Sequence, residues 1–129
     1  MDKEHREAIR DFILSQPEEK PVTAAPDPFW QGLRAAGTEL WLDTGDMEEA
    51  ASVWTAEMHA LTTNNTLLNA VIQKGIYDDF IPQAREMVRS LSPGDQVREI
   101  AFMLNARHGN RLAQRFGGMP CSSVVRRHG

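Results

Sequence analysis

Cysteine and long apolar runs are both scarce in this chain of 129 residues. Cys121 is the only cysteine, so an intrachain disulfide is excluded and a reducing compartment, the cytoplasm, is expected. No apolar run approaches the roughly 18–20 residues of a membrane-spanning helix, so we expect no membrane partner. The first seven residues are too charged to open a signal peptide.

Groups that commonly bind metals or phosphates are also few. The four histidines are scattered along the chain, and none has metal-ligand spacing with the cysteine. No glycine-rich loop of the phosphate-binding type follows either predicted strand. The sequence therefore predicts no metal and no cofactor.

Acidic side chains are missing from the end of the chain. Residues 100–129 contain five arginines and no acid, although the net charge of the whole chain is −4. Arg107, Arg111 and Arg115 are four residues apart and share one helix face, near a helix C-terminus that favours cations. We expect this face to be solvated. A nucleic-acid or other polyanion site is the least favoured interpretation, so no nucleic-acid partner is predicted.

The first third of the chain has little material for a core. Residues 3–15 have the apolar stripe of a short amphipathic helix, and residues 17–28 contain four prolines. A small apolar patch follows, made by Phe29, Trp30 and Leu33. Residues 1–37 are therefore interpreted as an arm, a helix and a proline-rich linker, that carries no chemistry.

Residues 38–117 have the alternation of an α/β protein with a parallel sheet. Strands are predicted at 39–42 and 58–61, and helices at 46–57, 66–74, 76–91 and 92–116. Asp46 and Ser92 have the sequence context of helix N-caps. Residues 118–129 are interpreted as an irregular basic tail.

Polar side chains follow both predicted strands. Asp43 ends the first strand, and Thr62, Thr63 and Asn64 end the second. The carboxyl ends of neighbouring parallel strands meet at one edge, where a small substrate can be bound. For Asp43, a functional role and a turn role are equally supported. For the second cluster, a cap or turn is favoured before other evidence.

Two segments resemble one known family. Residues 39–46 (Glu-Leu-Trp-Leu-Asp-Thr-Gly-Asp) and 61–68 (Leu-Thr-Thr-Asn-Asn-Thr-Leu-Leu) resemble the first two strands of transaldolases, including the small fructose-6-phosphate aldolase branch. Their order and spacing also fit, and the resemblance covers roughly residues 39–117. It implies a (β/α)₈ TIM barrel. The chain would then be a partial barrel, with the first two strand–helix units and an N-terminal helical extension.

The resemblance also implies an activity and a set of site residues. The family transfers a three-carbon ketol unit between sugar phosphates, through a Schiff base on a lysine of the fourth strand. Asp43 matches the catalytic aspartate that transfers a proton through water. Asn64 matches the amide that binds the dihydroxyacetone unit, and Thr62 matches a threonine lining the same pocket. Sugar-phosphate metabolism is therefore the expected context.

The chain departs from the family pattern in two places. Asn65 stands where the family usually has proline, and none of Lys3, Lys20 and Lys74 lies at a predicted strand end. A complete barrel needs ~250 residues, so we expect a truncation or frameshift near Phe116 and an inactive segment. The alternative is a non-catalytic interaction protein, in which exposed sheet edges produce a homo-oligomer.

Overall fold

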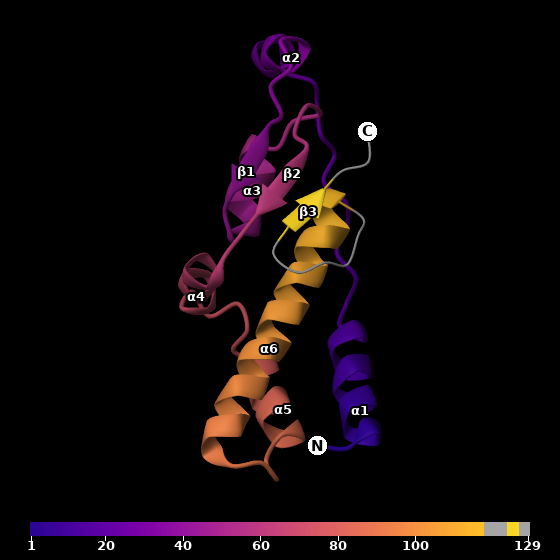
Figure 1. Ribbon diagram of the computed structural model, residues 1–129, viewed down its shortest axis with the longest axis vertical. Coiled ribbons are helices and arrows are strands. Elements are labelled where there is room, and N and C mark those ends of the chain that lie inside the picture. Colours follow the sequence, from indigo (N-terminus) through magenta and orange to yellow (C-terminus); the bar gives the residue numbers. More distant parts are fainter. Residues whose placement is uncertain (118–123, 127–129) are drawn as a thin grey trace.

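Helices dominate the fold. The computed structural model describes residues 1–117 and 124–126 (Figure 1). In chain order the elements are α1 (Lys3–Leu14), α2 (Pro28–Ala35), β1 (Trp41–Asp43), α3 (Met47–Val53), β2 (Ala60–Thr62), α4 (Asn65–Ile72), α5 (Phe80–Met87), α6 (Pro93–Leu112), the π-helical segment η1 (Ala113–Gly117) and β3 (Val124–Arg126).

The described strands form one small sheet with β2 in the middle. β1 and β2 are parallel and in register from Trp41–Ala60 to Asp43–Thr62, and α3 connects them. β3 pairs with the other edge of β2 in the antiparallel sense. Residues 124–126 were expected in an irregular tail, and that expectation is wrong because their backbone joins the sheet. The rest of the predicted tail, 118–123 and 127–129, lies outside the described residues.

This sheet does not define a barrel. Within the described residues only two strands are parallel, each is three residues long, and the third strand runs the opposite way. A single strand–helix–strand unit of this size occurs in many folds and identifies none of them. The partial TIM barrel therefore stays a prediction.

Two apolar clusters make the core. The first lies between the sheet, α3 and the end of α6, and its buried members include Leu61, Trp54 and Phe116. The second lies at the other end of the molecule, where α1 and α5 pack on α6 through residues such as Ile9 and Phe80. In Figure 1, α6 runs from the side of β3 to this second end, so one helix contributes to both clusters.

Several helix boundaries follow from capping residues. The predicted caps are confirmed: Asp46 accepts hydrogen bonds from the amides of Glu48 and Glu49, and Ser92 accepts one from Asp95. The helix predicted over 76–91 is shorter, because turns replace its first residues after Gly75, whose φ is +85°. Glycine is suited to this positive φ because it has no Cβ.

The N-terminal arm is attached to the rest of the molecule. The Phe12 and Phe80 rings stack with centroids 5.0 Å apart, which fixes α1 against α5. Further along, the Glu19 amide donates to the Gln114 side chain and the Val22 amide donates to the Arg115 carbonyl, both at 2.8 Å. The arm thus follows α6 and η1.

Candidate functional site

Asp43 and Thr62 meet at the carboxyl ends of β1 and β2. They are register partners, and the Thr62 hydroxyl donates to Asp43 Oδ1 at 2.9 Å. The Asp43 side chain is exposed and that of Thr62 is half-buried. The structure therefore brings together two of the three predicted site residues, with a carboxylate and a hydroxyl on adjacent strand ends.

This pair lies on the sheet face away from the first core cluster. Leu42 and Leu61 contribute to that cluster, and side chains alternate between the two faces of a strand. Asp43 and Thr62 therefore point to the opposite face, as does Trp41, whose side chain is 47% exposed. On this face the β1 side chains Trp41 and Asp43 are exposed, whereas Ala60 of β2 is buried.

Asn64, the third predicted residue, begins α4. Its side-chain oxygen accepts a hydrogen bond from the Leu67 amide at 3.0 Å, so it is the N-cap of this helix. The cap uses only the oxygen, and the residue is exposed. The amide nitrogen therefore stays available as a donor two residues beyond Thr62.

The loops that follow β1 and β2 touch at Gly45. A Cβ placed on Gly45 would lie 3.0 Å from Thr63 Oγ1 and 3.1 Å from the Leu67 carbonyl carbon and oxygen. Because backbone atoms cannot move aside as a flexible side chain can, glycine is the residue that permits this approach. Gly45 thus fixes how closely the two strand ends lie.

Two buried hydrogen bonds in series support the same loop. His108 on α6 lies 2.6 Å from the Gly45 carbonyl oxygen through Nε2, and 2.7 Å from the Tyr77 hydroxyl through Nδ1. A carbonyl can only accept, so Nε2 carries the proton and Nδ1 accepts from Tyr77. Burial lowers the pKa of His108, which keeps the ring neutral at pH 7 and consistent with this tautomer.

Lys74 pairs with Asp46 at the start of α3. The Asp46 carboxylate accepts a hydrogen bond from the Lys74 ammonium while it caps the helix. This contact raises the pKa of Lys74 and lowers the pKa of Asp46. A Schiff-base lysine needs a lowered pKa, so Lys74 is held in the wrong protonation state for that role.

The arginine face predicted to be solvated is largely covered, and that expectation is wrong. Arg107 is 5% exposed, and its Nη2 donates to the Pro17 carbonyl at 3.1 Å. Arg111 Nε donates to Glu19 at 2.6 Å, and Arg115 Nη1 donates to Glu48 at 3.1 Å. The arginines share one face as predicted, but the N-terminal arm and α3 cover it.

Two other kinds of site are not found among the described residues. No group of three or more histidine, cysteine, aspartate or glutamate side chains there is placed to hold a metal ion. Among the helices that the structure describes, none has both the length and the apolar character needed to cross a membrane.

Comparisons with known proteins identify no relative. No family model, no curated protein and no solved structure matches this chain. The resemblance to transaldolases therefore stays a prediction, supported by the two strand-end segments alone.

Sequence reasoning missed the two residues that hold the strand ends in place. The sequence signal for His108 is its position four residues from both Leu104 and Leu112, on the apolar face of α6. A histidine at such a position is expected to be buried and hydrogen-bonded. For Gly45 the sequence gives no comparable signal, since the close approach involves a loop about twenty residues away.

Proposed function

We propose that this chain is a transaldolase-like protein that binds the hydroxyl groups of a sugar phosphate at the carboxyl ends of β1 and β2. The observation that supports the proposal is the Asp43–Thr62 pair on neighbouring parallel strands. The proton of the Thr62 hydroxyl is donated to Asp43, so the carboxylate and the hydroxyl oxygen present acceptors for the hydroxyl groups of a polyol. The Asn64 side-chain nitrogen, at the start of α4, adds a donor.

The proposed binding is non-covalent. The three lysines of the sequence lie on α1, in the proline-rich linker and after α4. Lys74, which follows α4, forms an ion pair with Asp46, and this contact raises its pKa. Borohydride reduction in the presence of fructose 6-phosphate should therefore give no lysine adduct. Mass spectrometry that found a labelled lysine would contradict this part of the proposal.

Binding can be tested by calorimetric titration with fructose 6-phosphate. Three variants each remove one group and keep the local structure. Asp43→Asn keeps an acceptor for Thr62, Thr62→Val keeps the shape, and Asn64→Asp keeps the helix cap. Each lost hydrogen bond should weaken binding about 3- to 10-fold.

The control for this titration is Asp27→Asn, a change at the N-cap of α2 that leaves both strand ends intact. It should bind fructose 6-phosphate as the unmodified protein does. The proposed function would be refuted if the Asp43, Thr62 and Asn64 variants bound fructose 6-phosphate as tightly as the unmodified protein. It would also be refuted if the unmodified protein showed no saturable binding.

The second candidate function is self-association through β1. In the described sheet β1 is an edge strand, and edge strands expose backbone groups that can pair with another chain. Size-exclusion chromatography with light scattering distinguishes the outcomes. A discrete soluble oligomer favours self-association, whereas a monomer that binds fructose 6-phosphate favours the first function.

A further inference from the structure

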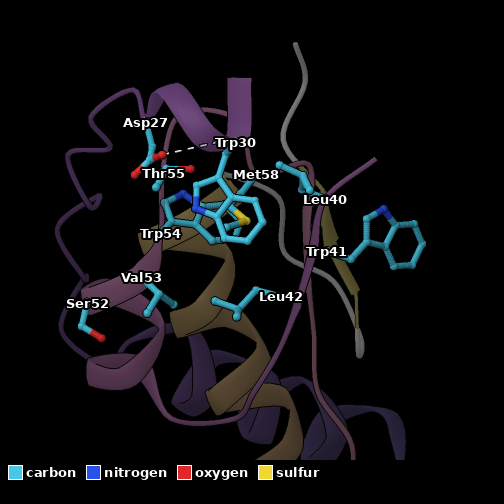
Figure 2. Close-up of a pocket in the computed structure, with 10 residues that line it drawn as sticks. All are labelled: Asp27, Trp30, Leu40, Trp41, Leu42, Ser52, Val53, Trp54, Thr55 and Met58. Atoms are coloured by element: carbon cyan, nitrogen blue, oxygen red, sulfur yellow. Dashed lines mark hydrogen bonds between the residues drawn. The ribbon is translucent and has the colours of Figure 1, made fainter. Parts of the chain in front are cut away.

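A hollow of about 470 Å³ lies between α2, β1 and the end of α3. Small-molecule sites typically enclose about 300–1,000 Å³, so its size suits a small ligand. Figure 2 shows Trp30, Trp54 and Met58 close together within it, with Leu42 below them and Asp27 above. The Trp41 ring is directed away from this group, on the other side of β1. The hollow is thus lined mainly by two indole rings and apolar side chains.

This hollow is separate from the proposed sugar-phosphate site at the strand ends, made by Asp43, Thr62 and Asn64. Leu40 and Leu42, which line it, face the first core cluster, whereas Asp43 and Thr62 point to the opposite face of the sheet. The two sites therefore lie on opposite faces of the sheet, and an inference about one does not rest on the other.

One carboxylate, Asp27, lines the hollow, and a second, Glu57, does not line it but contacts the Asp27 backbone. Asp27 Oδ1 accepts from the amides of Phe29 and Trp30 at 2.9 and 3.4 Å. Both oxygens of Glu57 accept from the Asp27 amide, at 3.1 and 3.2 Å. Glu57 is only 4% exposed. Within the described part of the chain, neither carboxylate belongs to an ion pair.

The Glu57 carboxyl group has hydrogen bonds that favour its charged form. Burial by itself raises the pKa of Glu57, but hydrogen bonds from the Thr55 hydroxyl and the Asp27 amide bring it below its ordinary value. Glu57 is therefore ionised at pH 7, and its charge adds to that of Asp27. The hydrogen bonds stabilise this charge, and because the group is largely removed from water, a cation placed nearby would be attracted to it more strongly than at the surface.

We propose that the hollow binds a small organic cation, an alkylammonium ion whose methyl groups lie against the indole ring of Trp30, beside the largely buried Trp54. Tryptophan presents the most favourable aromatic face for such a cation. Asp27 and Glu57 supply the complementary charge, while Met58 and Leu42 contact the alkyl part. The combination of aromatic faces and carboxylates selects a cation over a neutral molecule of the same shape.

Choline is the probe, and its neutral isostere, with carbon in place of the quaternary nitrogen, is the matched control ligand. Calorimetric titration of the full chain should show saturable binding of choline. The isostere should bind at least about tenfold more weakly, because it keeps the shape and loses the attraction to the rings and carboxylates.

Two variants test the named groups. Asp27→Asn keeps the N-cap of α2 and removes one charge, so choline affinity should fall about 3- to 10-fold. Trp30→Leu keeps an apolar side chain and removes an aromatic face, and a similar loss is expected. Trp41→Phe is the control on the protein, since its ring points away from the hollow, and it should bind choline normally. Circular dichroism of each variant establishes that the helices are retained.

The results that would overturn the proposal are specific. Equal binding of choline and the isostere would make the hollow a site for neutral apolar ligands. Unchanged choline affinity in Asp27→Asn and Trp30→Leu, or no saturable choline binding, would also reject it. Thr62→Val changes the proposed sugar-phosphate site at the strand ends and should bind choline normally. Loss of choline binding and loss of fructose 6-phosphate binding can therefore be told apart.

Discussion

The Tyr77 hydroxyl allows a direct test of the buried hydrogen bonds that connect Tyr77, His108 and Gly45. Tyr77 and His108 are 3% and 1% exposed, and the hydroxyl lies 2.7 Å from Nδ1 of the histidine. Tyr77→Phe removes the hydroxyl and keeps the ring, which also packs edge-on against Phe80. The variant therefore leaves Nδ1 buried without its donor.

The cost of this change follows from the burial of the group. A buried acceptor that loses its only donor destabilises a protein by about 1–3 kcal/mol. For a chain of this size, each kcal/mol lowers the melting temperature by roughly 3–6 °C. Tyr77→Phe should thus lower the urea midpoint measurably, with an unchanged m-value because the fold is retained.

The assay is urea unfolding followed by far-ultraviolet circular dichroism, for Tyr77→Phe, His108→Gln and the double variant. Residues that share a hydrogen bond give non-additive effects, so the double variant should lose less than the sum of the single losses. Additive losses, or a loss below about 0.5 kcal/mol in Tyr77→Phe, would refute the assigned hydrogen bond.

Three further predictions concern stability. First, because burial lowers the pKa of His108, below pH 6.5 the unfolded chain binds a proton that the folded chain does not. The free energy of unfolding should then decrease by up to about 1.4 kcal/mol for each unit by which the pH is lowered below 6.5, and His108→Gln should flatten this dependence in urea titrations. Second, Gly45→Ala should lower the free energy of unfolding by about 1–3 kcal/mol, since the added Cβ meets backbone atoms. Gly32→Ala, with open space around the added Cβ, should be neutral or stabilising by up to about 1 kcal/mol. Equal shifts of the melting temperature in the two variants would contradict the close approach at Gly45. Third, Arg111→Met should destabilise by leaving a carboxylate unpaired, and Arg107→Met, whose Nη1 has no partner among the described residues, should cost less. The reverse order of melting temperatures would show that these pairings are misassigned.

Local signals in the sequence were sufficient for much of the secondary structure. The amphipathic helix near the N-terminus, the caps at Asp46 and Ser92 and the long final helix depend on neighbouring residues, and the structure confirms them. The helix α2 was missed, although Asp27 caps it and Pro28 occupies its first position. The surrounding prolines gave the whole segment the composition of a linker.

Longer-range features could not be derived in the same way. Helical spacing placed three arginines on one face, but it could not indicate that the N-terminal arm covers that face. The pairing of β1 with β2 was predicted from the pattern of strand and helix. The Gly45 contact was not predicted, because it depends on how two loops pack rather than on either sequence alone.

The geometry of the proposed sugar-phosphate site depends on α6 more than on the strands. Two parallel strands of three residues form few hydrogen bonds, and such a small unit is marginally stable by itself. Gly45 approaches Thr63 and Leu67 closely, and its carbonyl oxygen is hydrogen-bonded to His108. Changes at Tyr77 should therefore alter sugar-phosphate binding without touching the ligand. A weaker affinity in Tyr77→Phe, measured at a temperature where the variant is fully folded, would separate this positioning effect from simple unfolding.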